Sequence, residues 1–347
     1  MIQKADRLSN VKEYYFSKKL REVAALRKEG KEIINMAIGS PDLPPPDAVI
    51  KALTETANTK GAHQYQSYQG IPELREAIAN FYLKHYRVTL NPNQEILPLM
   101  GSKEGIMHIS MAFLNKGDSV LIPDPGYPSY ASASNLMQAN IISYNLSAYN
   151  NWLPDYKEIE KQDLTGVKMM WLNYPHMPTG TNATKEHFTK AVAFAKKHDI
   201  MLVNDNPYSF ILNDNPLSLL ETEGARDVAI ELNSLSKTFN MAGWRVGMVV
   251  GKGEIIKSIL QVKSNMDSGM FLGIQKGALE ALNCSKDWFN ELNKTYIKRR
   301  KIVWEIFDKL DCYYNKEGVG LFVWAKLPKG RSAIEFTDQL LKEKDVF

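Results

Sequence analysis

Cysteine and long apolar runs are scarce in this chain of 347 residues. Only Cys284 and Cys312 are present, which excludes a disulfide framework and favours a reducing compartment. No apolar stretch approaches the ~20 residues needed to cross a bilayer. The segment Met1–Leu20 is polar and helix-like and lacks the apolar centre of a signal peptide. We therefore expect a cytoplasmic protein that does not associate with membranes.

The chain also lacks an excess of charge of one sign. Its 43 Lys and Arg residues nearly balance 39 Asp and Glu residues, and the basic residues are dispersed in short pairs. Such pairs are typical of solvated helix faces, and no nucleic-acid-binding motif accompanies them. The six histidines are scattered without the spacing of a metal site. We expect neither a nucleic-acid partner nor a metal.

What is present is an alternation of helix-period segments and short apolar runs from about residue 72 onward. This pattern predicts an α/β fold with a mostly parallel sheet. Pro72 is predicted at a first helical position and Thr184 as the cap of a helix that reaches His198. Strands are predicted at Val120–Ile122, Ile141–Ile142, Met169–Leu172, Ile200–Val203 and Met248–Val250.

The two ends of the chain differ from this central region. A proline cluster at 41–46 predicts an extended linker. A long charged helix is predicted from about Trp288, followed by a strand of a second layer at Gly318–Trp324. We expect a large domain at residues 47–290 and a smaller α+β domain formed by residues 1–46 and 291–347.

Polar residues follow several of the predicted strands, where ligands bind in open α/β sheets. Gly101–Gly105 precedes a helix, so its amides could hold a phosphate. Asp205 follows a buried strand and would need a cationic partner, such as a cofactor nitrogen. Asn173–Gly180 and the loop that carries Tyr127 also follow strands. Taken singly, each of these segments is equally compatible with an ordinary turn or helix cap.

Lys237 lies in the segment Asn233–Gly247, just after the apolar run Val228–Ile230. A lysine at the end of a buried strand is costly to keep charged, which suits a Schiff base with an aldehyde. Ser234, Ser236 and Arg245 are the donors that a phosphate on that aldehyde would need. The alternative is a strand-to-loop turn with a solvated lysine and arginine.

In their order and spacing these segments resemble the class I and II aminotransferases, which are pyridoxal-phosphate enzymes of fold type I. The resemblance extends from the Gly39 loop through Gly320. The wording of Gly70–Ala77 and Lys263–Gly269 is most similar to the branch that holds LL-diaminopimelate and aspartate-like aminotransferases. The resemblance therefore implies a large domain whose sheet is sandwiched by helices, and a transaminase that acts on an amino acid and a 2-oxo acid.

The resemblance also implies a role for each matched residue. Lys237 would form the Schiff base with the cofactor and move the substrate's α-proton, and Asp205 would pair with the ring nitrogen. Tyr208 would contact the phenolic oxygen, and Asn173 is a further cofactor-binding candidate that could reach the same oxygen. Tyr127 would stack on the ring. The phosphate would be held by Ser102, Lys103, Ser234, Ser236, Arg245 and Tyr65, with Tyr65 lent by the neighbouring subunit of a homodimer, while Gly39 and Tyr14 would close the site over the substrate.

Two departures from the family pattern affect these expectations. Met177 stands where the family has an asparagine that donates to the phenolic oxygen, and a thioether cannot donate that bond. We therefore expect a raised Schiff-base pKa. The family also has a later arginine that binds the substrate α-carboxylate, whereas this sequence ends at Phe347. We expect that the natural chain continues; the alternative is a protein that has lost this anchor.

Two other functions remain compatible with the sequence. One uses the same fold and cofactor for β-elimination, as in carbon–sulfur lyases. The other is a cofactor-binding module without turnover, which the presence of both Lys237 and Asp205 disfavours.

Overall fold

The computed structural model describes residues 2–9, 11, 13 and 15–347. Its main feature is a seven-stranded sheet with strand order β1-β7-β6-β5-β4-β2-β3. β7 runs antiparallel to β1 and β6, while all the other neighbours are parallel. The strands are β1 (Ile96–Leu99), β2 (Ser119–Asp124), β3 (Asn140–Asn145), β4 (Val167–Leu172), β5 (Met201–Asp205), β6 (Ala229–Ser234) and β7 (Gly247–Gly251). The mostly parallel sheet predicted from the sequence is confirmed.

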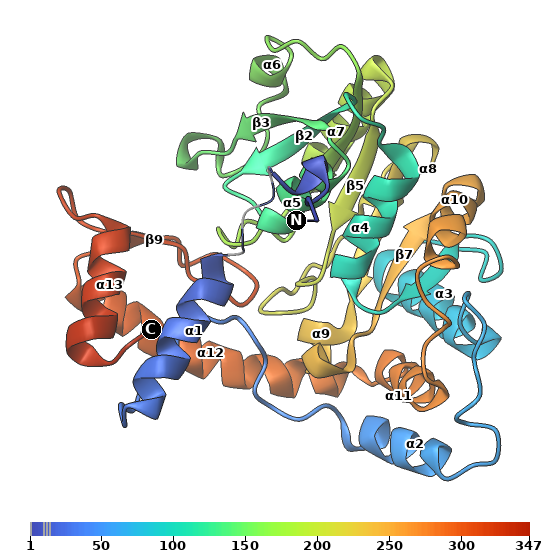
Figure 1. Cartoon of the computed structure of the whole chain (residues 1–347), viewed down its shortest axis with the longest axis horizontal. Coiled ribbons are helices and arrows are strands. Elements are labelled where there is room, and N and C mark those ends of the chain that lie inside the picture. Colours follow the sequence, from blue (N-terminus) through green and yellow to red (C-terminus); the bar gives the residue numbers. More distant parts are fainter. Residues whose placement is uncertain (1, 10, 12, 14) are drawn as a thin grey trace.

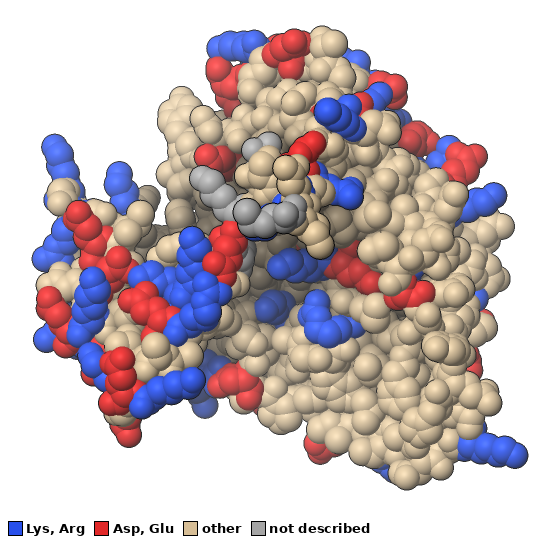
Figure 2. Space-filling view, viewed as in Figure 1, with Lys and Arg blue, Asp and Glu red and all other residues tan. Residues whose placement is uncertain are grey.

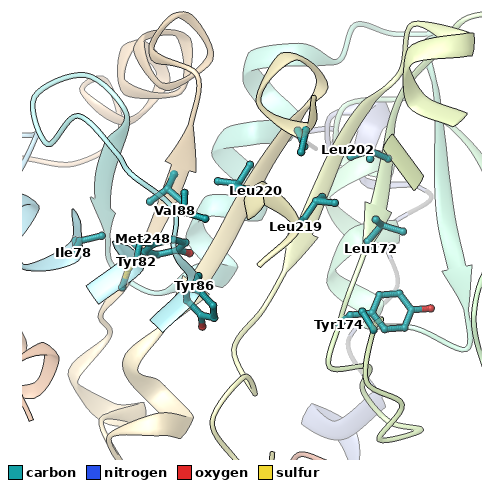
Figure 3. Packing of buried hydrophobic residues seen from close by; sticks show 14 of the residues in the cluster. Ile78, Tyr82, Tyr86, Val88, Leu172, Tyr174, Leu202, Leu219, Leu220 and Met248 are labelled. Carbon is teal, nitrogen blue, oxygen red and sulfur yellow. The ribbon is translucent and has the colours of Figure 1, made fainter. Parts of the chain in front are cut away.

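Helices cover both faces of this sheet, because successive side chains of each central strand point to opposite faces. Met170 of β4 belongs to one core cluster and Trp171 to the other. The first face packs on α2 (Asp47–Ala57), α3 (Pro72–Tyr86), α7 (Lys185–His198) and α11 (Leu272–Leu282), and the second on α4 (Ser102–Phe113), α5 (Pro128–Leu136) and α10 (Gly253–Lys263). Figure 3 shows Tyr82 and Tyr86 of α3 beside Met248 of β7 in the first cluster.

A second group of elements lies beside the sheet, at the left of Figure 1. It comprises α1 (Tyr15–Lys28), part of α12 (Lys286–Lys309), β8 (Tyr313–Tyr314), β9 (Ala325–Lys326) and α13 (Ala333–Lys344). The segment after α1 meets the C-terminal segment here, because Ile34 forms a parallel bridge with Val346. Val23, Ile33 and Leu341 form a small core between them.

The remaining elements are short. They are the 3-10 turns η1 (Asp6–Leu8), η2 (Ala148–Asn150), η3 (Leu219–Glu221) and η4 (Ala242–Trp244), and the one-turn helices α6 (Tyr156–Ile159), α8 (Ala225–Val228) and α9 (Leu235–Thr238). Within the described part of the chain, no helix is both long and apolar enough to cross a membrane.

Several local predictions are confirmed. α3 begins at Pro72, and Thr184 caps α7 by accepting a hydrogen bond from the amide of His187 at 3.1 Å. The five predicted strands correspond to β2, β3, β4, β5 and β7.

Two local predictions are wrong. Among the described residues before Tyr15, only Asp6–Leu8 are helical, so a helix does not extend through Met1–Leu20. Gly318–Trp324 is not a strand. Gly320 adopts a φ of 83°, and its amide donates to the carbonyl oxygen of Ile211, which lies in the loop after β5. The segment therefore bonds to that loop instead of to a neighbouring strand.

Candidate active site

The predicted site residues converge because β5 and β6 are parallel neighbours whose carboxyl ends meet at one edge of the sheet. Asp205 ends β5 and is in register with Leu232 of β6. Ser234 ends β6, and Lys237 lies in the single turn of α9 that follows. On the other side of β6, Ser234 pairs with Gly247 of β7.

Asp205 is a buried carboxylate with one free oxygen. Its side chain is 4% exposed, and Tyr130 donates a hydrogen bond to Oδ2 at 2.9 Å. Oδ1 has no hydrogen-bond partner among the described residues. Burial raises the pKa of Asp205 to about 7, although the bond from Tyr130 lowers it and the charge of Glu231 raises it further. A positively charged donor at Oδ1 would stabilise the ionised form.

Glu231, whose charge raises the pKa of Asp205, lies inside the sheet. It is fully buried on β6 and accepts hydrogen bonds from the hydroxyl of Tyr82 at 3.1 Å, from Asn204 Nδ2 at 3.0 Å and from the amide of Leu219 at 3.0 Å. Burial raises the pKa of Glu231, and the hydrogen bonds from Asn204 and the amide of Leu219 oppose that shift.

Lys237 carries the amine of the site. Nζ donates to the carbonyl oxygen of Gly39 at 2.5 Å, so the segment that carries Gly39 lies at this edge of the sheet. Burial lowers the pKa of Lys237, and the charge of Arg245 lowers it further. A lysine with a lowered pKa is a better nucleophile near neutral pH.

The N-terminus of α4 forms a cradle beside this amine. Gly101 precedes the helix with a φ of 92°, and a Cβ there would lie 2.1 Å from Arg245 Nη2. A Cβ at Gly247 would lie 2.7 Å from the amide nitrogen of Ser102. The amides of Ser102 and Lys103 belong to the first turn of α4, where the N–H groups of a helix point beyond its N-terminus. Main-chain amides, the guanidinium and the helix dipole together suit a phosphate.

The two serines of the Lys237 segment also lie in this region. Both are buried, and the Ser234 hydroxyl donates to Ser236 Oγ at 2.9 Å. Ser234 Oγ in turn accepts the amide of Ser236 at 3.1 Å, which caps α9. Figure 2 shows a hollow on this face of the molecule, between α1 and α9, with several Lys and Arg side chains around it.

Aromatic side chains border the carboxylate. The ring of Tyr127 meets that of Tyr130 edge-on at 5.6 Å, and Tyr130 stacks on Trp171 at 4.7 Å. Burial raises the pKa of Tyr127. The charge of Asp205 also raises this pKa, whereas the charge of Arg245 lowers it. Tyr208 is 8% exposed and meets Phe322 edge-on at 5.9 Å.

Asn173 contacts the main chain at both ends of its amide. Nδ2 donates to the carbonyl oxygen of Asp205 at 2.6 Å, and Oδ1 accepts the amide of Met177 at 3.0 Å. Asn173 thus ties the loop of Met177 to the end of β5.

The two remaining predicted residues are Tyr65 and Tyr14. Tyr65 is 90% exposed in the single chain. Tyr14 lies outside the described residues.

Sequence reasoning missed two residues of the site. Tyr130 lies one helical turn after Tyr127 in α5, and this spacing could have identified it. Phe322 could not have been found, because its contact depends on the unpredicted path of Gly318–Trp324. A Cβ on Gly39 would lie 2.5 Å from the ring of Phe322.

The sequence profile of the family "Aminotransferase class I and II" matches residues 31–347. The chain belongs to this family.

Curated relatives agree with that assignment. An LL-diaminopimelate aminotransferase of Dehalococcoides mccartyi is 40% identical over 342 residues, which cover 98% of this chain and 88% of the relative. That of Aquifex aeolicus is 36% identical over 348 residues, covering 100% and 90%.

Solved structures agree as well. The substrate-bound BacF structure from Bacillus subtilis has a TM-score of 0.96 at 35% identity, covering 100% of this chain and 88% of that one. Aspartate aminotransferase from Thermus thermophilus with maleate has a TM-score of 0.92 at 25% identity, covering 100% and 91%. The protein is a pyridoxal-phosphate-dependent aminotransferase of fold type I, as the sequence predicted.

The residues present fit this cofactor. The free Oδ1 of Asp205 matches a protonated ring nitrogen, the amine of Lys237 matches an aldehyde, and the cradle at Gly101 matches a phosphate.

Proposed function

We propose that this aminotransferase moves an amino group from an L-amino acid to a 2-oxo acid, with Lys237 as the covalent attachment point of pyridoxal phosphate. Asp205 would pair with the ring nitrogen, Tyr208 would contact the phenolic oxygen and Tyr127 would cover the ring. Ser102, Lys103, Ser234, Ser236 and Arg245 would hold the phosphate. Asn173 positions the loop that borders the ring, and Gly39 lies on the substrate side of Lys237.

The observation that carries this proposal is the burial of Asp205 with an unpartnered Oδ1 among the described residues. A carboxylate in this position is costly to ionise unless a cation reaches it. A protonated ring nitrogen supplies that charge, and the ionised carboxylate in turn keeps the nitrogen protonated.

The chain's own residues supply the proton transfer. When bound, pyridoxal phosphate provides an electron sink for the pair left behind by the substrate's α-proton. The lowered pKa of Lys237 allows Nζ to accept that proton and to return it at the next step. The carbonyl of Gly39 accepts a hydrogen bond from Nζ and so orients the amine.

We further propose that two copies of the chain form a homodimer with shared active sites. The 90% exposure of Tyr65 in the single chain supports its donation to the neighbouring subunit's phosphate. We divide each copy into a large domain at 47–290 and a small domain at 1–46 and 291–347. The inner boundary falls inside α12, so this helix belongs to both. A cytoplasmic location is consistent with the two unpaired cysteines.

LL-diaminopimelate is the first amino donor to test, because both curated relatives described above carry that name. We propose a dicarboxylic 2-oxo acid such as 2-oxoglutarate as the acceptor.

Half-reaction spectra with single substrates test the proposal. We expect LL-diaminopimelate or glutamate to convert the cofactor to its amine form, and 2-oxoglutarate to reverse the change. Release of pyruvate from a β-substituted amino acid would instead indicate elimination. A spectrum that no amino acid changes would indicate a binding module without turnover, and either result would overturn the proposal.

A further inference from the structure

Four ionisable side chains are buried together beneath the first two turns of α4, outside the roles assigned above. The side chains of His108, Lys263 and Asp267 are 3%, 3% and 7% exposed, and that of Glu104 is 18% exposed. We propose that this quartet positions the phosphate cradle and couples it to the segment that carries Tyr65. The inference rests on the proposed phosphate site.

Glu104 replaces the missing side-chain cap of α4. Gly101 occupies the cap position and has no side chain to offer. Glu104 Oε2 instead accepts the amide of Met100 at 2.5 Å, in the manner of the return bond of a capping box. This bond fixes the residue before Gly101, and thus the direction in which the amides of Ser102 and Lys103 point.

His108 lies between the two carboxylates. Its Nε2 is 3.2 Å from Glu104 Oε1, one turn earlier on the same face of α4. Neither ring nitrogen has a hydrogen-bond partner among the described residues. The nearest polar atoms of Glu104, His108 and Asp267 all lie within 4.8 Å of one another.

Asp267 joins this group to the next segment. Lys263, the last residue of α10, places Nζ 2.9 Å from Oδ1 and 2.7 Å from Oδ2 of Asp267. Oδ1 also accepts the amide of Gly269 at 2.8 Å. Gly269 has a φ of 83°, and a Cβ there would lie 2.4 Å from the carbonyl oxygen of Gln66. The backbone at Gln66, next to Tyr65, therefore packs against the turn at Gly269 that hydrogen-bonds to Asp267.

Glu104, His108 and Asp267 together offer the donor atoms of a divalent-cation site. Lys263 already supplies a positive charge to both oxygens of Asp267, so that carboxylate is neutralised without an ion. We therefore assign the quartet a positioning role.

The test compares binding of pyridoxal phosphate and of pyridoxal, which lacks the phosphate, to the full chain after removal of its cofactor. We expect Glu104→Ala to raise the Kd of pyridoxal phosphate about tenfold, in line with the loss of a charge-assisted hydrogen bond, and to leave that of pyridoxal within about twofold. Glu104→Gln keeps an acceptor oxygen and should restore most of the loss. Asp267→Asn should reproduce the phosphate-specific effect if Glu104→Ala fails to fold.

Glu186→Ala is the matched control, because Glu186 also lies in the first turn of a helix and pairs with a residue four positions later, Lys190. It should change neither Kd. Hydrogen exchange of the amide of Met100 in the cofactor-free chain should accelerate in Glu104→Ala only.

The outcomes separate the two proposals. A wild-type chain that binds both compounds equally would contradict the proposed phosphate site itself. A wild-type preference for pyridoxal phosphate that Glu104→Ala and Asp267→Asn both retain would overturn the positioning role alone. Equal weakening of both compounds would reduce the quartet to general structural support and would also overturn the role.

Discussion

Asp205 illustrates how a residue's environment determines its chemistry. Its carboxylate is buried, held by Tyr130 at one oxygen and unpartnered at the other among the described residues. The sequence located Asp205 at the end of a buried strand and predicted a cationic partner. It did not reveal Tyr130, which sets the orientation of the carboxylate through a contact between β5 and α5.

Asp205→Asn should stabilise the cofactor-free protein at high pH. The folded pKa of about 7 lies above the ordinary value of 3.8, so folding retains a proton that the unfolded chain has lost. Stability therefore falls as pH rises from about 4 to about 7, and the penalty is fully present above that range. We expect the variant to exceed wild type by up to about 4 kcal/mol at pH 8 and to match it near pH 4.

Urea unfolding of both proteins at several pH values measures this difference. Asp227→Asn is the control, because the carboxylate of Asp227 is 71% exposed and pairs with Lys196 at 3.0 Å. It should change stability by no more than about 1 kcal/mol. A difference between Asp205→Asn and wild type that does not depend on pH would contradict the assigned pKa.

Met177→Asn should lower the pKa of the protonated nitrogen that joins Lys237 to the cofactor. The thioether of Met177 cannot donate a hydrogen bond, whereas an asparagine amide can stabilise the phenolate that forms. A spectral pH titration of the cofactor-loaded protein measures this pKa. Met177→Leu has a similar volume and no donor, so it should titrate as wild type does. An unchanged pKa in Met177→Asn would contradict the claim that Met177 raises the pKa of this nitrogen.

Elements rather than single residues create the phosphate cradle. α4 supplies the amides, β7 supplies Gly247 and the turn after η4 supplies Arg245. The order of strands and helices could be predicted, because apolar periodicity and Pro72 or Thr184 mark the elements locally. The packing of Arg245 against Gly101 could not be predicted, since it joins segments that only the sheet brings together.

The prediction of a strand at Gly318–Trp324 was wrong for a related reason. Its apolar residues are compatible with a strand, but Gly320 has a positive φ and bonds to the loop at Ile211. Long-range hydrogen bonds override local propensity here.

Gly101→Ala should weaken binding of pyridoxal phosphate by about tenfold or more. Besides the strain of a positive φ, the new Cβ would lie 2.1 Å from Arg245 Nη2 and displace the guanidinium. Gly117→Ala is the matched control, because Gly117 has a φ of 89° and nothing within 4 Å of the added Cβ. Both variants should lose about 1 to 3 kcal/mol of stability in urea unfolding, because a Cβ strains a backbone with a positive φ. Equal cofactor affinity in the two variants would contradict the cradle.

At the scale of the whole molecule, α12 connects the sheet to the second group of elements. Near its start, Trp288 Nε1 donates to the carbonyl oxygen of Thr238, one residue after Lys237, at 2.9 Å. Further along, Asn293 donates to the carbonyl oxygen of Phe210 at 3.0 Å, and Arg299 pairs with Asp42 at 2.7 Å. The sequence predicted this helix but not which loops it would contact.

Mixing two inactive variants should restore activity if active sites are shared. In a heterodimer of Lys237→Ala and Tyr65→Ala, one site carries both substitutions and the other carries neither. Random exchange of subunits should therefore recover about a quarter of wild-type activity. Transaminase assays before and after denaturation and refolding of the mixture measure the gain. Activity that stays at the average of the two variants would place Tyr65 in its own subunit's site.

The central claim is that Lys237 holds the cofactor, and reduction with borohydride tests it most directly. Borohydride converts a lysine–cofactor bond to a stable amine, which peptide mass spectrometry then locates. We predict that the added mass lies on the peptide containing Lys237 and is absent from Lys237→Ala. Attachment to a different lysine in the wild-type protein, or no attachment at all, would contradict the account.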